Sequence, residues 1–156
     1  MEIERKFLVE EVPRVKKFKS KKIRQGYISI NPEIRIRKIG RQSFLTVKSS
    51  GYLTRNEFEL KLSSRQFRKV WKEAKKLHLS KTRYFIPLDN RCIAELDIYN
   101  KKLKGLITVE VEFESEETAE NFERPKWFGE EVTYDNDYKN NNLVKYGIPL
   151  SYNSVL

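Results

Sequence analysis

Hydrophobic and polar positions alternate along most of this chain. At its start, Ile3 and Phe7 alternate with Glu2, Glu4 and Lys6. Residues two positions apart in a β-strand share one face, so this spacing produces one apolar face and one charged face. Similar patterns predict strands at residues 1–9, 22–30, 33–39, 43–49, 55–62, 81–88, 91–99 and 106–114, with a last short strand at 130–134.

A helical period replaces this alternation in the middle of the chain. Phe67, Val70 and Ala74 belong to one apolar stripe, which predicts an amphipathic helix at about residues 65–78 with a basic outer face in solvent. Shorter helices are predicted at residues 115–122 and 137–146. The overall pattern predicts a mainly β domain with a few helices (α+β), built as a sandwich or a barrel.

Composition narrows the picture. A length of 156 residues suits a single domain spanning residues 1–156, and the net charge of +10 predicts an anionic partner. Cys92 is the only cysteine and His78 the only histidine, which excludes an internal disulfide and disfavours histidine-based metal sites. With no long apolar stretch and no signal peptide, we expect a cytoplasmic protein without a membrane partner.

The charged faces of the predicted strands are segregated by sign. Carboxylates on one strand face lie about 7 Å apart and repel each other by roughly 2 kcal/mol at an effective dielectric of 20. An ordinary solvated sheet explains any single strand of this kind, but a set of them stores repulsion without structural benefit. Acidic sets occur at Glu2/Glu4, Glu57/Glu59, Glu95/Asp97 and Glu110/Glu112/Glu114, and basic sets at Arg35/Arg37 and Lys81/Arg83.

A closed barrel with inward charges accounts for this segregation. About eight strands enclose a lumen wide enough for one small ligand. Carboxylates without histidine or cysteine favour Mg²⁺ or Mn²⁺, and arginine and lysine bind phosphate oxygens, so the combination suits phosphoryl transfer. The chain has no P-loop signature and no serine–histidine or cysteine–histidine pair that would indicate nucleophilic catalysis.

In these motifs the chain resembles the CYTH superfamily, the triphosphate tunnel metalloenzymes, and most closely its small bacterial single-domain members. The opening Glu2-x-Glu4-x-Lys6 is similar to the signature that names the family. Further segments resemble the family in order: residues 23–27, 34–37, 45–48, 55–59, 81–84, 95–97, 110–112 and 127–133. Ala94, where the family often has tryptophan, and residues 100–104, which replace a Gly-rich turn, depart from its pattern.

The resemblance implies an eight-stranded antiparallel β-barrel that forms a tunnel with a charged interior and helices packed outside. It implies that a divalent metal is held by Glu2, Glu4, Glu110 and Glu112, with Asp97 as a further or water-mediated ligand. It also implies that substrate is bound by Lys6, Arg24, Arg35, Arg37, Lys48, Arg55 and Arg83. Lys81 matches the position that activates water in the family, although binding phosphate is a competing role for it. Tyr27 matches a residue associated with a closed tunnel mouth, so we predict it as a tunnel gate.

The function predicted from these features is metal-dependent hydrolysis of a linear triphosphate, with inorganic tripolyphosphate as the leading substrate. A nucleotide triphosphatase and a class IV adenylate cyclase remain alternatives, although no segment indicates an adenine site. A polyphosphate- or RNA-binding module without catalysis is the alternative from another class, and the acidic doublets oppose it. The oligomeric state is left open, a homodimer included.

Overall fold

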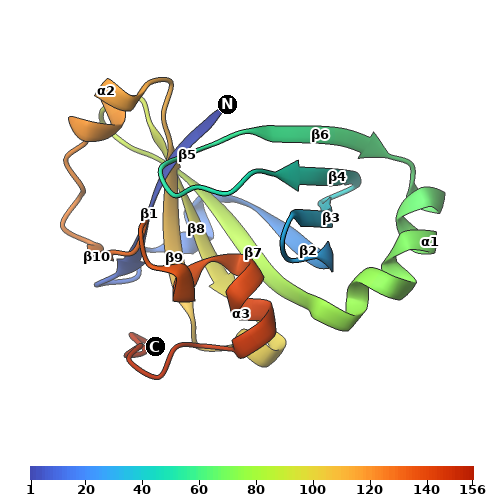
Figure 1. Ribbon diagram of the computed structural model, residues 1–156. Coiled ribbons are helices and arrows are strands. Elements are labelled where there is room, and N and C mark those ends of the chain that lie inside the picture. Colours follow the sequence, from blue (N-terminus) through green and yellow to red (C-terminus); the bar gives the residue numbers. More distant parts are fainter.

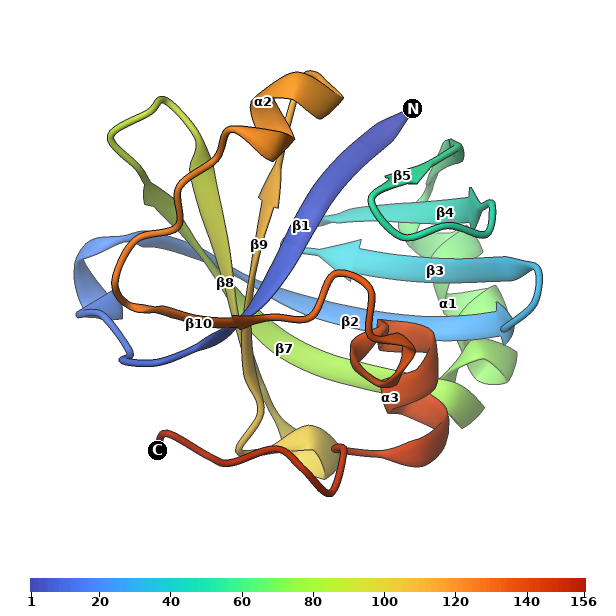
Figure 2. The same cartoon turned by 60° about the vertical axis from the view of Figure 1, so that its left-hand side comes forward.

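The computed structural model describes all residues 1–156 (Figures 1 and 2). The strands are β1 (Glu2–Val9), β2 (Lys19–Ser29), β3 (Glu33–Ile39), β4 (Gln42–Lys48), β5 (Thr54–Arg55), β6 (Glu57–Leu62), β7 (His78–Pro87), β8 (Ile93–Tyr99), β9 (Ile107–Glu112) and β10 (Phe128–Glu131). The α-helices are α1 (Ser64–Ala74), α2 (Glu116–Glu120) and α3 (Asn140–Tyr146). Short 3-10 helices are η1 (Val15–Lys17), η2 (Lys75–Leu77), η3 (Lys101–Leu103) and η4 (Asn136–Tyr138).

The strands form one antiparallel sheet that curls into a nearly closed barrel. Their order is β10-β1-β9-β8-β7-β2-β3-β4-β6. The short strand β5 pairs with β1, with Glu2 opposite Arg55, and so brings the β4–β6 end of the sheet back to its beginning. Figure 2 shows the strands surrounding a common interior. The predicted barrel with outer helices is confirmed, and β5 and β10 are short additions to its eight longer strands.

An aromatic core covers the outer face of β1, β8 and β9. Phe7 is fully buried, and its ring centroid lies 5.1 Å from that of Phe128 and 6.1 Å from that of Phe122. Phe122 follows α2, which packs on β1, while Phe128 begins β10. The apolar residues of β1 therefore point outward into this core, which leaves Glu2, Glu4 and Lys6 for the interior.

Helix α1 covers the outer face of β2 and β3. A capping box joins Ser63 and Gln66 at its start, and Phe67 and Ala74 are its buried residues. The approach to β2 is close, because a Cβ atom on Gly26 would lie 2.6 Å from the carbonyl oxygen of Ala74. Only glycine fits this crossing.

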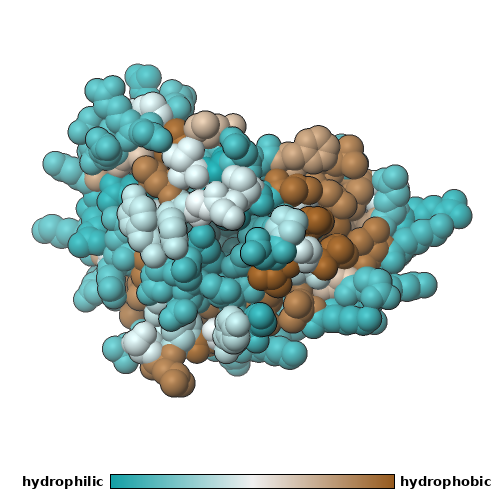
Figure 3. All heavy atoms as spheres, in the orientation of Figure 1, coloured by the Kyte–Doolittle hydropathy of each residue, from teal (hydrophilic) through white to brown (hydrophobic).

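The outer faces of β4 and β6 have little cover. Phe58 and Leu60 of β6 are 60% and 51% exposed, and Figure 3 shows hydrophobic side chains gathered over this part of the molecule. None of the helices combines the length and the apolar character needed to cross a lipid bilayer.

The C-terminal segment crosses from β10 to the side of the barrel near α3 (Figure 2). Two bonds fix it to one wall: Lys6 Nζ donates to the carbonyl oxygen of Tyr138, and the Tyr99 hydroxyl donates to Asn140 Oδ1 over 2.6 Å. Tyr99, Tyr138 and Leu143 belong to a second buried cluster. This segment therefore adds residues from beyond the last strand to the barrel interior.

Candidate active site in the charged barrel

A cavity of about 470 Å³ occupies the barrel interior. Its lining contains as many acidic as basic side chains. The acidic ones are Glu2, Glu4, Glu33, Glu57, Glu59, Glu95, Glu110 and Glu112. The basic ones are Lys6, Arg35, Arg37, Lys48, Arg55, Lys81, Arg83 and Lys139. The alternation seen in the sequence thus places charges of both signs around one enclosed space.

Strand register explains how the acidic groups of β1 and β9 meet. Glu4 lies directly opposite Glu112, and Lys6 lies opposite Glu110. Directly opposed residues in an antiparallel pair have Cβ atoms about 5 Å apart. Lys6 Nζ lies 3.7 Å from the Glu110 carboxylate, whereas Glu4 and Glu112 form no ion pair with any cation. Neither of these two neighbouring side chains therefore has a cationic partner within ion-pair distance, although Lys48 and Arg83 attract both from farther away.

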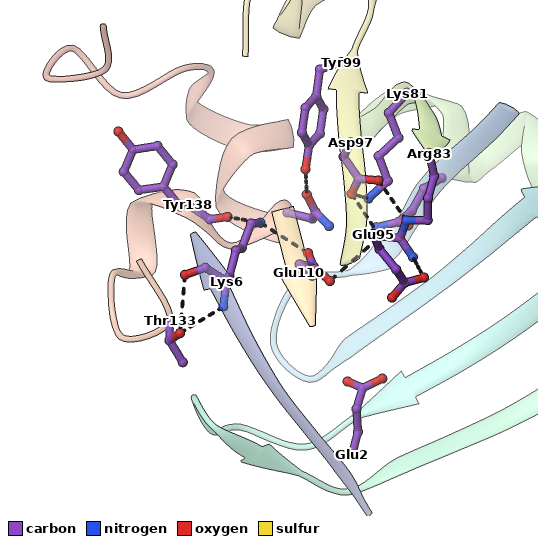
Figure 4. A network of polar contacts seen from close by, with 12 residues as sticks. Glu2, Lys6, Lys81, Arg83, Glu95, Asp97, Tyr99, Glu110, Thr133 and Tyr138 are labelled. Atoms are coloured by element: carbon purple, nitrogen blue, oxygen red, sulfur yellow. Dashed lines mark hydrogen bonds and ion pairs between the residues drawn. The ribbon is translucent and has the colours of Figure 1, made fainter. Parts of the chain in front are cut away.

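A buried ionic cluster occupies β7 and β8 (Figure 4). Lys81 Nζ lies 2.6 Å from Asp97 Oδ2, and Arg83 binds both oxygens of Asp97 at 2.8 and 2.9 Å. Arg83 also lies 3.0 Å from Glu95 and 3.8 Å from Glu110. Figure 4 shows these side chains converging, with Glu2 apart from them. Arg83 thus links the fully buried aspartate to the carboxylates that face the cavity.

Further ion pairs involve cations of β3, β4 and β5. Lys48 lies 2.7 Å from Glu2 and 3.8 Å from Glu57, and Arg37 lies 3.7 Å from Glu59. A second group surrounds Glu33, which lies 3.0 Å from Arg55 and 3.5 Å from Arg35. The buried Nε atoms of Arg35 and Arg37 have no hydrogen-bond partner. Each of these two guanidinium groups therefore keeps one donor that no protein group satisfies.

The pKa values reflect this arrangement. Burial, together with repulsion by Glu110, raises the pKa of Glu4 to about 8. Burial opposes ionisation of Glu110 as well, but Lys6, Arg83 and Lys81 hold its pKa far below the usual range. Burial lowers the pKa of Lys81 to about 8, against the attraction of Asp97. The interior therefore holds a carboxyl group and an amine that both titrate near neutral pH.

The donor chemistry fits a hard divalent cation. Carboxylate oxygens dominate the β1–β9 wall, and Glu4 and Glu112 lack a cationic partner. No group of three or more acidic, histidine or cysteine side chains is already gathered as a metal site, because several of the carboxylates point toward lysine or arginine instead. The residues present are thus the right ligands, and a cation would have to draw them away from their internal partners.

Most of the residues predicted from the sequence meet in this cavity. Glu2, Glu4, Lys6, Arg35, Arg37, Lys48, Arg55, Lys81, Arg83, Glu110 and Glu112 all line it. Asp97 and Tyr27 are buried beside it without lining it. Asp97 is bound by Lys81 and Arg83, and the Tyr27 hydroxyl accepts a hydrogen bond from Gln25 Nε2 over 2.6 Å.

Arg24 requires a correction. Its guanidinium lies on the outer face of β2, with its central carbon 5.1 Å from a ring centroid of Trp71 and 5.7 Å from that of Phe67. It does not line the central cavity. Strand parity is the reason, because Gln25 faces inward and its neighbour Arg24 therefore falls on the opposite face, the one that Gly26 presents to α1. Arg24 therefore lies apart from the residues that line the cavity.

Sequence reasoning missed several residues of the lining. Gln25 and Glu33 share their strand faces with Tyr27 and Arg35, so parity alone gives their positions. Tyr52, Tyr138, Lys139 and Asn140 reach the cavity from loops and the C-terminal segment, and no local pattern marks them.

Comparison with known proteins identifies relatives of this chain. The chain is 42% identical over 146 residues to an inorganic triphosphatase of Nitrosomonas europaea, across 92% of this chain and 96% of that protein. It is 32% identical over 148 residues to an inorganic triphosphatase of Acetivibrio thermocellus, across 92% and 93% of the two chains. A crystal structure of the inorganic triphosphatase NE1496 superposes with a TM-score of 0.70 at 39% identity, covering 92% of this chain and 94% of that one. The CYTH domain family model matches residues 1–142, and the chain belongs to the CYTH domain family.

Proposed function

We propose that this protein hydrolyses inorganic tripolyphosphate to diphosphate and phosphate with the help of Mg²⁺ or Mn²⁺. The single observation that carries the proposal is the shared cavity, where the unpaired carboxylates Glu4 and Glu112 lie within one lining with Lys81, Arg83 and Arg37. The two inorganic triphosphatases described above support the substrate class.

Four carboxylates of the β1–β9 wall would hold the cation: Glu2, Glu4, Glu110 and Glu112. When bound, a divalent cation neutralises phosphate charge and polarises a coordinated water. Asp97 has a different role in this proposal. Both of its oxygens are engaged by Lys81 and Arg83, so it fixes the positions of these two cations.

The basic side chains would bind the phosphate chain. Lys6, Arg35, Arg37, Lys48, Arg55 and Arg83 all reach the cavity from strands of its wall. Their charges offset the negative charge of the substrate and the charge that develops on the leaving diphosphate. Binding exchanges partners, because pairs such as Lys48–Glu2 open when phosphate oxygens and a cation replace them.

Lys81 would accept the proton of the attacking water. With a pKa of about 8, a substantial part of its amine is neutral near that pH, which a general base requires. The oxygen of water forms a bond to the terminal phosphorus while the bond from that phosphorus to the bridging oxygen breaks. The proton passes to Lys81 Nζ, and the bond electrons leave with the diphosphate.

Release of phosphate tests the proposal. We expect metal-dependent turnover of tripolyphosphate that falls by about 10²-fold or more in Glu4→Ala and Glu112→Ala. Glu114→Ala is the matched control, because Glu114 lies just past the end of β9 and is exposed outside the cavity. Tight binding of tripolyphosphate without turnover at any divalent metal would instead indicate a binding module. Formation of cyclic AMP from ATP would indicate a cyclase.

A further inference from the structure

A second cavity of about 530 Å³ adjoins the first. The two share five lining residues, namely Glu33, Lys48, Tyr52, Arg55 and Lys139. The rest of the outer cavity is largely neutral and rich in hydrogen-bonding groups: Asn31, Ser49, Ser50, Asn136, Asn141 and Asn142. The outer cavity therefore lacks the dense charge of the barrel interior, although the two are adjacent.

Tyr52 and Lys139 line both spaces and contact each other where the cavities adjoin. Lys139 Nζ donates a 2.6 Å hydrogen bond to the carbonyl oxygen of Gly51 and lies 4.2 Å from the ring centroid of Tyr52. The ring of Tyr134 lies 5.9 Å from that of Tyr52. Lys139 and Tyr134 belong to the C-terminal segment, whereas Tyr52 belongs to the loop between β4 and β5. We call the side chains of Tyr52 and Lys139, which line both cavities, the partition.

The partition joins two walls of the barrel. Lys6 and Tyr99 fix the C-terminal segment to β1 and β8, and Lys139 reaches across to the β4–β5 loop. Burial and the nearby charge of Arg55 lower the pKa of Lys139, and the attraction of Glu33 offsets part of this effect. Since Tyr52 is 42% exposed, the contact can open without disturbing the core.

We propose that Tyr52 and Lys139 determine specificity by excluding triphosphates that carry an organic substituent. This inference rests on the proposed function. If water attacks near Lys81 on β7, the far end of the phosphate chain lies toward Arg55 on β5, which three strands (β8, β9 and β1) separate from β7. A nucleoside attached to that end would have to occupy the space now crossed by the partition.

The outer cavity has groups that would accommodate a nucleoside once the partition opens. Its asparagine side chains offer hydrogen-bond donors and acceptors to a base and a ribose. Asn141 Oδ1 is buried and has no hydrogen-bond partner. Removing the partition is therefore expected to extend the site and to change the preference between free and substituted triphosphates.

Two variants test the proposal with two substrates. We measure kcat/KM for tripolyphosphate and for ATP in wild type, Lys139→Met and Tyr52→Ala. We expect the ratio of ATP to tripolyphosphate to rise by about tenfold or more in both variants. Lys145→Met and Tyr146→Ala are matched controls. Lys145 Nζ lies 5.2 Å from the ring centroid of Tyr146, and both residues lie outside the two cavities. Their ratios should equal that of wild type.

An unchanged ratio would overturn the proposal. If Lys139 only binds phosphate, Lys139→Met lowers kcat/KM for both substrates equally. The ratio of ATP to tripolyphosphate then stays at the wild-type value in Lys139→Met and in Tyr52→Ala. Dissociation constants for tripolyphosphate and a non-hydrolysable ATP analogue, measured calorimetrically in the same proteins, give a second ratio. Absence of tripolyphosphate turnover in wild type would contradict the proposed function alone, because the ratio of dissociation constants would still test the partition.

Discussion

The ammonium group of Lys81 lies 2.6 Å from the carboxylate of Asp97, and neither side chain is more than 1% exposed. Burial of a single lysine charge is costly, and here the aspartate offsets part of that cost. Arg83 binds the same carboxylate and adds a second positive charge beside Lys81. Lys81 is consequently held in one position while its proton remains easy to remove.

The pH dependence of hydrolysis should report this pair. If neutral Lys81 accepts the proton, kcat/KM rises as pH increases through about 8. Asp97 attracts the ammonium form and so raises the pKa of Lys81. Asp97→Asn removes the attraction, and we expect the rising limb to move by about one pH unit or more toward acid. The measurement is kcat/KM for tripolyphosphate against pH.

Glu95→Gln is the control for this shift. It removes an ion pair of Arg83 while leaving the contact between Lys81 and Asp97 in place. The rising limb of kcat/KM against pH in Glu95→Gln should stay near that of wild type. A limb that persists at the same pH in Lys81→Met would show that another group accepts the proton.

Glu4 should make the metal-free protein less stable as pH rises. Its folded pKa of about 8 exceeds the ordinary value of 4.5, so the folded protein retains a proton that the unfolded chain has lost between these values. The free energy of unfolding therefore falls across this interval. We expect Glu4→Gln to match wild type near pH 4.5 and to melt more than about 3 °C higher at pH 8, as measured by calorimetry with a chelator.

Glu131→Gln provides a control of opposite sign. The hydrogen bond from Arg5 lowers the pKa of Glu131, so its stabilisation is present above 4.5 and is lost as pH falls through the lower folded value. This variant should melt below wild type at neutral pH and approach it in acid. A Glu4→Gln difference that is equal at every pH would contradict the account of Glu4.

Divalent cations should stabilise the protein through the β1–β9 wall. A ligand that binds only the folded state at 100 times its dissociation constant adds about 2.7 kcal/mol to the free energy of unfolding. We expect Mg²⁺ or Mn²⁺ to raise the melting temperature near pH 8, and a chelator to reverse the effect. Glu112→Gln should reduce the shift and Glu114→Gln should not. Equal shifts in both variants would place the cation elsewhere.

Two arginines on neighbouring strands should differ sharply in their effects. Arg37 of β3 lines the cavity, whereas Arg24 of β2 lies over Trp71 outside the barrel. Arg37→Ala should lower kcat/KM for tripolyphosphate by about 10²-fold, because a phosphate contact is lost. Arg24→Ala should retain turnover and lose about 0.5–1 kcal/mol of stability with its cation–π contacts. A large loss of turnover in Arg24→Ala would return this residue to the site.

Much of the barrel can be predicted from the sequence because its strands alternate so regularly. Glu2 and Glu4 of β1, or Arg35 and Arg37 of β3, can share a face only in an extended chain, and one enclosed space is the arrangement that brings such faces together. The same rule gives the position of Gln25. It also excludes Arg24 from the interior, since Arg24 and Tyr27 are three residues apart and lie on opposite faces.

Other parts of the site depend on contacts between distant segments. Lys139 meets Gly51 across 88 positions of the chain and also contacts Tyr52, and neither segment has a repeating pattern. The internal ion pairs are equally hard to predict from the sequence. Periodicity places Lys48 inside the barrel but does not select Glu2 as its nearest partner. Such choices follow from register and loop geometry, which a single sequence does not specify.

The position of β1 between β9 and β10 affects how the protein folds. β1 is the first strand of the sequence, yet it pairs with β9, which ends at Glu112, and with β10, which ends at Glu131. Before β10 docks, Phe7 lacks its contact with Phe128, and the apolar face of β1 is exposed and prone to aggregation. Closure of the barrel therefore depends on contacts between segments more than 100 residues apart, which form late in folding.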